Sequence, residues 1–399
     1  MDRRTFIMGM GLLALSQGMT ACTGANARTL RVRILKNSIP PQILNRFRQE
    51  LRRSSPGSFH LDFTPVPELP GLFSLLEAWK PAPKGEPRSG FPFPIPFQNT
   101  RRPQVADLVT LGDYWLTRAI QQQLIQPLEL EKLSGWKALP TEWQRLVTRD
   151  RQGQLTTSGQ VWGAPYRWGM TVMAYRRDVF QKKGWEPPQD WGDLWRPELK
   201  GQISLLESAR EVIGLTLKML GDSYNSPKPL SSVPGLNTEL KALHNQARFY
   251  SSTNYLQPLL LKDTAVAVGW SLDLIPLLQT SRHIGIVVPT SGTALWSDLW
   301  VRPVAASTTS ATEDLLEAWI DFCWQAPIAQ SLSILSRAAS PVVVGSDRAT
   351  LPAELQNNGL ILPSQALLQK CEFLHPLSAS ALQEYRQTWE AIRSGARLT

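Results

Sequence analysis

The stretch of residues 161–220 constrains the fold of this chain more than any other part of the sequence. Its apolar run at 171–175 predicts a buried strand, a loop rich in tryptophan follows, and residues 202–206 predict a second strand. A helix then begins, with Ser208 and Glu211 at the spacing of a capping box. Because strands that alternate with helices are typical of α/β domains, the sequence predicts an α/β fold.

The size and charge of the chain narrow the possible classes of protein. At 399 residues, with 42% hydrophobic residues, the chain is long enough for two packed domains. Lysine and arginine exceed aspartate and glutamate by 42 to 33, a formal net charge of +9. The positive residues are dispersed and no basic stripe is interleaved with aromatic residues. We therefore expect no binding to nucleic acid, and interpret the charge as favouring solubility or an anionic membrane surface.

Several segments, taken in order, carry a resemblance to a known family. They are 164–175 (APYRWGMTVMAY), 190–201 (DWGDLWRPELKG), 205–212 (LLESAREV), 268–271 (VGWS) and 295–299 (LWSDL). In type and order they resemble the spermidine/putrescine-binding proteins of bacterial polyamine ABC importers, a branch of the extracellular solute-binding superfamily. The resemblance covers most of the chain after Leu30. It implies a type II periplasmic-binding-protein fold: α/β, with two lobes, each a mixed sheet flanked by helices, joined by two hinge crossings.

The same resemblance implies how the chain divides between the lobes. We expect lobe 1 to comprise residues 28–169 plus 297–345, and lobe 2 to comprise residues 170–296 plus 346–399. A Pro-rich insertion at about 67–104 interrupts the resemblance inside lobe 1. We interpret the insertion as a surface loop folded onto its own lobe, with contact to a permease or another protein as the alternative. Lobes joined by two crossings are expected to close around a ligand.

Residues 1–27 have the features of an export signal with a lipobox and a short tether. Arg3 and Arg4 resemble a twin-arginine motif, and a short apolar core follows them. Cys22 ends the segment MTAC, which resembles a lipobox and implies a lipid anchor at Cys22 on the periplasmic or extracytoplasmic face of the membrane. A secreted protein without lipid and an N-terminal membrane anchor are the alternatives, although the apolar run is short for a membrane span.

The resemblance also implies a ligand site. A polyamine needs carboxylates for its ammonium groups and aromatic faces along its chain. Trp270 and Trp296 match aromatic walls of the family's cleft, and Asp298 matches its carboxylate. Tyr114 matches a tyrosine of the first lobe, and Glu211 matches an acid at the helix start. Each has another interpretation: the tryptophans as core, Asp298 as a hinge residue, Tyr114 as packing under the insertion, and Glu211 as half of a capping box.

Two departures from the family's pattern change the expected charge of the site. Ser208 stands where the family has an acid, so one of two carboxylates that hold an ammonium is missing. Lys36 adds an ammonium that repels a polyammonium ligand unless it extends to solvent or pairs with Asp298 or Glu211. Together, Lys36 and the helix start at Ser208 would favour a carboxylate or phosphate. We therefore expect a polyamine or a similar small amine or zwitterion, with an anionic solute as the alternative.

Nothing in the sequence indicates catalysis, a metal or a cofactor. The histidines show no metal-ligand spacing, and no P-loop, dinucleotide fingerprint or nucleophile elbow is present. Cys323 and Cys371 either form a disulfide or are buried separately. We expect a monomer, not an enzyme, that binds a small-molecule solute and docks on an ABC permease. The second hypothesis is a lipoprotein that uses the same fold as a protein-interaction scaffold.

Overall fold

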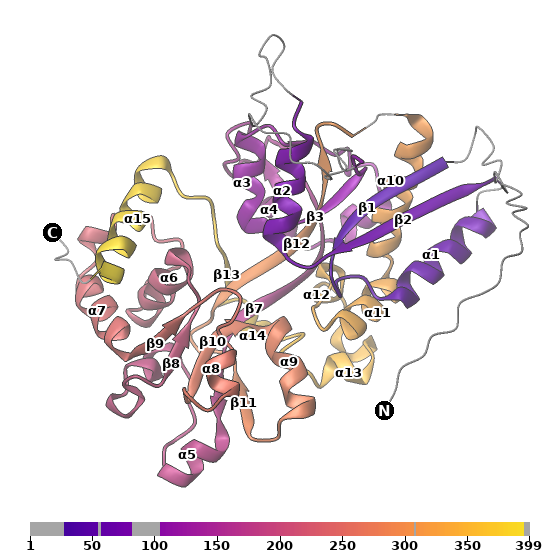
Figure 1. The fold of residues 1–399 in the computed structure, drawn as a ribbon. Helices are drawn as coiled ribbons and strands as arrows, with labels where there is room; N and C mark the ends of the chain where they lie inside the picture. Colours follow the sequence, from indigo (N-terminus) through magenta and orange to yellow (C-terminus); the bar gives the residue numbers. More distant parts are fainter. Residues whose placement is uncertain (1–27, 55–56, 82–103, 307–308, 395–399) are drawn as a thin grey trace, which may run out of the picture.

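A single sheet of eleven strands runs through the molecule, and helices pack around it (Figure 1). The computed structural model describes residues 28–54, 57–81, 104–306 and 309–394. The main path of the sheet is β2 (Phe59–Val66), β1 (Arg28–Leu35), β3 (Leu108–Gly112), β12 (Ala294–Pro303), β7 (Ala164–Arg176), β10 (Val266–Trp270), β8 (Ile203–Leu205) and β9 (Ala247–Tyr250). The predicted α/β class is confirmed.

The first lobe is built on three parallel strands. β1 pairs with β2 on one side and with β3 on the other. Leu30, Val32 and Ile34 of β1 are buried and the residues between them are partly exposed, which is the alternation expected of a half-buried strand. The helices packed around these strands are α1 (Pro41–Ser54), α2 (Leu69–Trp79), α3 (Asp113–Gln121), α4 (Thr141–Val147), α10 (Ser310–Trp324) and α11 (Ala326–Ser336). α1 buries Ile43, Phe47 and Leu51, which share one face of the helix.

The second lobe continues the same sheet with strands of mixed direction. β10 is antiparallel to β7 and parallel to β8, which is parallel to β9, while β11 (Ile284–Val287) is antiparallel to β7. The helices of this lobe include α5 (Arg177–Lys183), α6 (Ala209–Met219), α7 (Leu236–Gln246), α8 (Gln257–Leu260), α9 (Ser271–Thr280) and α15 (Ala379–Ser394). The strand predicted at 202–206 is present as β8.

Two long antiparallel strands, β7 and β12, join the lobes. Every residue of β7 is buried. Its first half pairs with β12 and its second half pairs with β10 and β11, so the strand passes from one lobe into the other. Tyr166 stacks on Trp300 with ring centroids 4.1 Å apart, and Trp168 lies 5.3 Å from the Trp143 ring. Tyr166 and Trp168 therefore pack the hinge.

The remaining short elements lie near the lobe boundary and the rim. They are β4 (Ile125–Gln126), β5 (Thr148–Arg149), β6 (Gln160–Val161), β13 (Glu372–Phe373), α12 (Pro341–Val344), α13 (Ala353–Gln356) and α14 (Gln365–Leu368).

Among the described residues, no helix is long and apolar enough to cross a membrane. Cys323 and Cys371 are free thiols. The export signal with Cys22, and most of the expected insertion, lie outside the described residues, although α2 falls within the insertion.

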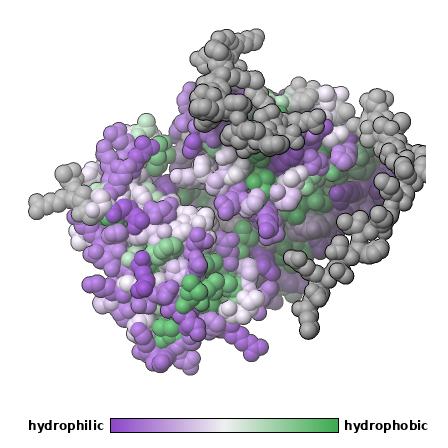
Figure 2. Space-filling view, in the orientation of Figure 1, coloured by the Kyte–Doolittle hydropathy of each residue, from purple (hydrophilic) through white to green (hydrophobic). Residues whose placement is uncertain are grey.

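The surface of the second lobe is mostly hydrophilic (Figure 2). An apolar area interrupts it over α8 and α9. Leu260, Leu261 and Leu278 in this region are exposed by 46%, 62% and 39%. A patch of a few leucines is ordinary for a protein surface.

Candidate functional site

One face of β7 forms the centre of the candidate site. Arg167, Gly169 and Thr171 alternate along the strand, so they belong to one face of the sheet. Trp296 of β12 is the backbone partner of Gly169, and Trp270 of β10 is the partner of Thr171. Directly opposed residues of antiparallel strands lie on the same face, and both indoles are half-buried. The hinge strands thus bring together two aromatic residues that are far apart in the sequence.

Gly169 makes room for one of these indoles. A Cβ on Gly169 would lie 2.4 Å from Trp296 Cζ2 and 2.7 Å from Ser271 Oγ. Both distances are shorter than any real contact of such an atom, so the indole rests against bare backbone. The close approach of Trp296 to β7 therefore requires glycine at this position.

Glu211 is held at one end of this face. Its Oε1 accepts a hydrogen bond of 3.1 Å from Thr171 Oγ1, whereas its Oε2 accepts none from the residues that the structure describes, although Glu211 is only 7% exposed. Burial raises the pKa of Glu211 to about 7, and the Thr171 hydrogen bond, the Arg210 charge and Trp270 act in the opposite direction. Glu211 is therefore a buried carboxyl group with one oxygen available to a ligand.

Ser208 caps α6, and the capping box is only half formed. Ser208 Oγ accepts from the Glu211 backbone N–H at 3.4 Å. The Glu211 carboxylate does not complete the reciprocal bond, because it turns to Thr171 instead. The interpretation of Glu211 as a capping residue thus holds for its backbone and not for its side chain. Ser208 itself is partly exposed at the start of the helix.

Asp298 is buried in an ion pair with Arg167, which the sequence analysis did not single out. Arg167 Nε lies 2.6 Å from Asp298 Oδ2, and the two residues are 1% and 3% exposed. Burial raises the pKa of Asp298, and the Arg167 charge opposes that rise. The negative charge expected from Asp298 is thus balanced by a neighbouring cation. An arginine inside an otherwise apolar buried strand was the sequence signal for this pair.

The Arg167 guanidinium is only partly satisfied. Its Nη1 and Nη2 are buried without a hydrogen-bond partner in the described structure. The Tyr166 ring lies beside the guanidinium, with its centroid 6.0 Å from Cζ. An unpaired buried polar group costs about 1–3 kcal/mol, and a charged group costs more. Arg167 therefore offers two nitrogen atoms to an acceptor that the protein does not provide.

Asp113 is a second residue that the sequence analysis missed. It begins α3 beside the predicted Tyr114, is 8% exposed, and accepts a hydrogen bond of 3.0 Å at Oδ1 from the Ser297 N–H. Burial raises the pKa of Asp113 to about 7; the Ser297 hydrogen bond and the Arg149 charge lower it, and the Asp298 charge raises it. Its place directly after the carboxyl end of β3 was a signal that could have identified it.

Tyr114 and Lys36 lie at the exposed side of the first lobe. Tyr114 is 64% exposed, with its ring edge-on to Trp115 at 5.9 Å, so it does not pack beneath other described residues. Lys36 is exposed after the end of β1, and its backbone N–H bonds to Val66 O at 2.8 Å. No ion pair joins Lys36 to Asp298 or Glu211 in the described residues. The lysine thus extends to solvent, one of the two outcomes expected for it.

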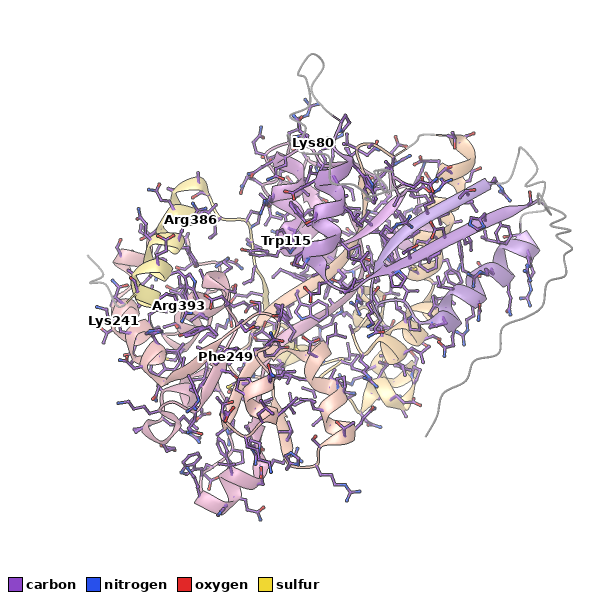
Figure 3. All side chains as sticks on the ribbon, in the orientation of Figure 1. Lys80, Trp115, Lys241, Phe249, Arg386 and Arg393 are labelled. Carbon is purple, nitrogen blue, oxygen red and sulfur yellow. The ribbon has the colours of Figure 1, made fainter. Side chains whose placement is uncertain are left out.

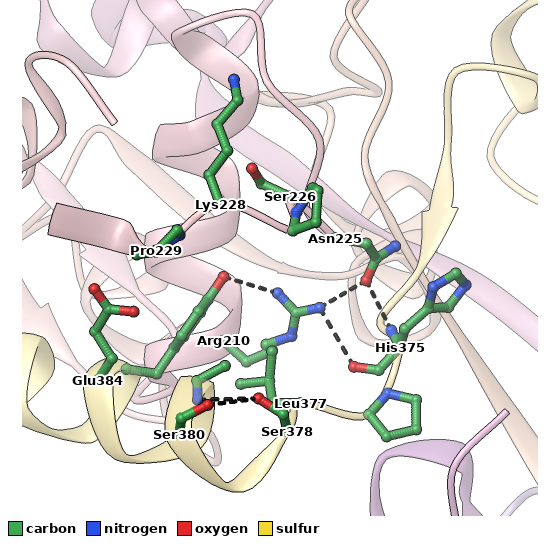
Figure 4. Close-up of a pocket in the computed structure, with 14 residues that line it drawn as sticks. Arg210, Asn225, Ser226, Lys228, Pro229, His375, Leu377, Ser378, Ser380 and Glu384 are labelled. Atoms are coloured by element: carbon green, nitrogen blue, oxygen red, sulfur yellow. Dashed lines mark hydrogen bonds between the residues drawn. The ribbon is translucent and has the colours of Figure 1, made fainter. Parts of the chain in front are cut away.

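A pocket of about 570 Å³ lies beside α6 in the second lobe (Figure 4). Arg210 occupies its wall, buried to 6% exposure. Its guanidinium donates to Tyr224 O, to Tyr385 Oη at 3.0 Å and to Asn225 Oδ1 at 2.6 Å. These bonds tie α6 to a neighbouring loop and to the C-terminal helix α15. The arrangement is that of a structural brace, because the protein itself satisfies the cation.

A larger groove of about 1190 Å³ lies between the two halves of the molecule. Trp143 and Arg145 line it from the first lobe, and Asn225 and His375 line it from the second. Burial lowers the pKa of His375, and nearby arginines add to this effect. Figure 3 labels one residue on each of the facing sides of the lobes: Trp115 of α3 in the first lobe and Arg386 of α15 in the second.

The comparison with protein families decides the class of this protein. The family of bacterial extracellular solute-binding proteins matches residues 103–370. The chain belongs to this family. Its members bind solutes and are not enzymes, and within the family the chain is a divergent relative of the spermidine/putrescine-binding proteins.

Individual relatives show which proteins of this family the chain is similar to. The spermidine/putrescine-binding periplasmic protein of Escherichia coli K12 is 25% identical over 289 residues, which cover 72% of this chain and 78% of the relative. The putrescine-binding periplasmic protein of the same organism is 24% identical over 304 residues, covering 72% and 78%. A spermidine/putrescine ABC transporter substrate-binding protein from Streptococcus pneumoniae has a similar structure, with a TM-score of 0.72, 19% identity and coverage of 92% and 99%. The predicted two-lobed fold is thereby confirmed.

Proposed function

We propose that this member of the polyamine importer family is a lipid-anchored extracytoplasmic protein that captures a polyamine or a similar small amine or zwitterion between its lobes. The observation that carries the proposal is the site on β7. Two half-buried indoles, Trp270 and Trp296, lie on the same sheet face as a buried carboxylate whose Oε2 has no partner. An ammonium group supplies the hydrogen-bond donor that Glu211 lacks.

The chemistry of this face suits an organic cation. A cation over a tryptophan face gains roughly 0.5–2 kcal/mol, more when water is excluded. An ammonium beside Glu211 also favours the ionised carboxylate, which burial disfavours in the free protein. Binding energy from both lobes then stabilises the closed form, and the ligand shifts the opening equilibrium only by its greater affinity for that form.

The closed form docks on the membrane permease of an ABC importer, as in the family. The lipobox at Cys22 and the twin-arginine motif support export and anchoring. Metabolic labelling with a radioactive fatty acid tests the anchor: wild-type protein incorporates label, and Cys22→Ser does not. Labelling of both proteins, or of neither, contradicts lipidation at Cys22. Light scattering of the mature chain tests the expected monomer.

Titration calorimetry tests the function. Putrescine, spermidine, spermine and a wider set of small amines and zwitterions are titrated into the wild-type protein and into Glu211→Gln. We expect saturable binding of at least one solute and a loss of at least tenfold in affinity in the variant. Binding of none of these solutes at millimolar concentration would reject the proposal.

A further inference from the structure

We propose that Arg167 and Glu211 hold opposite ends of a linear zwitterion, with its carboxylate at Arg167, its ammonium at Glu211 and its carbon chain against Trp296. This inference rests on the proposed function and specifies the class of solute. The site then prefers an ω-amino acid to a diamine of the same length.

The Arg167 end of the site lacks an acceptor. Its Nε is bonded to Asp298 at 2.6 Å, while Nη1 and Nη2 have no partner within the described part of the chain, and the residue is 1% exposed. Native proteins pair nearly all buried polar groups, so an orphaned buried guanidinium needs an explanation. A carboxylate is the ligand group that matches the paired N–H donors of arginine.

The Glu211 end lacks a donor. Thr171 Oγ1 bonds to Oε1 at 3.1 Å, and Oε2 is buried without a partner. An ammonium group carries three donors and no acceptor, so it complements this oxygen. The two unsatisfied groups are thus of opposite charge and opposite hydrogen-bonding character.

The spacing of the two ends fits a chain with charges at its termini. Arg167 and Thr171 are four residues apart on β7, about 13 Å along an extended strand. Both belong to the same face, and between them Gly169 leaves bare backbone on which Trp296 rests. A methylene chain that joins the two charged ends therefore lies along an apolar, aromatic surface.

A second ammonium is poorly matched to the Arg167 end. Among the described residues Arg167 forms an ion pair with Asp298 alone, and this pair leaves no net negative charge for a diamine to contact. The unbonded guanidinium nitrogen atoms repel an ammonium placed near them. The Arg167 end therefore discriminates between ω-amino acids and diamines.

Calorimetry with matched solutes tests the inference. Cadaverine, δ-aminovalerate and glutarate have equal carbon chains and differ only in their end groups, and 1,8-diaminooctane, 8-aminooctanoate and suberate form a longer trio. We expect the ω-amino acid of at least one trio to bind the wild-type protein at least tenfold more tightly than its diamine and diacid. A diamine that binds as tightly as the amino acid, or tighter, overturns the inference, as does the absence of binding in both trios.

Three variants test which residues cause the preference for ω-amino acids over diamines. Arg167→Met is expected to lose at least tenfold in affinity for the amino acid and to gain affinity for the diamine, because Asp298 is then free to pair with the second ammonium group. Arg167→Met/Asp298→Asn removes both charges, and keeps the test valid if the single variant fails to fold; it too must lose the preference. Arg176→Met is the matched control, since Arg176 is also buried on β7 but is paired with Asp178, and it must keep the preference.

The failure of this inference is distinguishable from the failure of the proposed function. If polyamines bind and ω-amino acids do not, the proposed function stands and the assignment of Arg167 to a carboxylate falls. If the wider solute set also fails to bind, both fall. An equal loss of affinity for amino acid and diamine in Arg167→Met likewise overturns the assignment.

Discussion

Two buried arginines of this protein lie in contrasting surroundings. Arg210 donates to the Tyr224 carbonyl. It also donates to the amide oxygen of Asn225, in the same loop, and to the Tyr385 hydroxyl of α15 (Figure 4). Arg167 makes one hydrogen bond, to Asp298, and its Nη1 and Nη2 remain unpaired. A buried cation that the protein satisfies holds the fold together, whereas one that it leaves unsatisfied is free to meet a ligand. The lining of a pocket alone therefore does not identify the site.

The largest expected effect comes from replacing Arg210, the arginine whose hydrogen bonds the protein satisfies. Arg210→Met removes several charge-assisted hydrogen bonds and leaves their acceptors buried, so we expect a loss of about 4 kcal/mol in the free energy of unfolding. Urea unfolding measures the loss. Solute selectivity should not change, because the Arg210 guanidinium bonds to a neighbouring loop and to α15 and does not lie on the β7 face. A stable variant with altered selectivity would contradict the structural role of Arg210.

The pH dependence of stability tests the state of the buried carboxyl groups at the site, above all Glu211. The pKa of Glu211 is raised in the folded protein to about 7, above its usual value of 4.5, so the folded state binds more protons between these values. Stability without ligand therefore falls as pH rises from about 4.5 to about 7, by roughly 3 kcal/mol for this group, and is constant above. Asp113 adds a fall of the same sign.

Glu211→Gln is the control for this pH dependence. The variant should lose the Glu211 share of the slope in unfolding experiments between pH 4.5 and 7. Ligand affinity should change in the opposite direction in the wild-type protein, rising with pH toward about 7, because an ammonium favours the ionised carboxylate. An unchanged slope in the variant would show that Glu211 titrates normally.

Gly169→Ala tests whether the solute binds against Trp296. The added methyl group would lie 2.4 Å from Trp296 Cζ2, so the indole must move. We expect a loss of about 1–2 kcal/mol in stability, as for an overpacked core, and a fall of about tenfold in solute affinity. Calorimetry and thermal unfolding measure the two effects. Full affinity in a folded variant would place the solute away from Trp296.

Lys36→Met should have the smallest effect. Lys36 is exposed and forms no ion pair among the described residues, so we expect stability to change by less than about 0.5 kcal/mol. Affinity for a cationic solute should change by no more than about threefold, since exposed charges are screened. A gain of tenfold or more in diamine binding would show that Lys36, and not Arg167, opposes a second ammonium.

The sequence could predict the elements whose signals are local. The strand at 171–175, the helix after Ser208 and the two tryptophans followed from periodicity, capping spacing and the family resemblance. The first half of β7 has no such local signal, because its pairing depends on β12, which comes much later in the chain. The family resemblance implied a crossing in this region, and only the structure shows that one continuous strand makes it.

The charges of the site could be predicted only in part. Asp298 was identified, but its partner Arg167 lies 131 residues away, and only the paired strands bring the two together. Glu211 has the spacing of a capping residue, and only the fold shows that its side chain turns to Thr171. Hydrogen bonds between distant segments decide which charges are satisfied, and a single sequence does not contain that information.

The most direct test of the account is a crystal structure of the protein with its bound solute. The account predicts solute density against Trp270 and Trp296, with a nitrogen atom within hydrogen-bond distance of Glu211 Oε2. Density in the Arg210 pocket instead, with the β7 face unchanged, would contradict it.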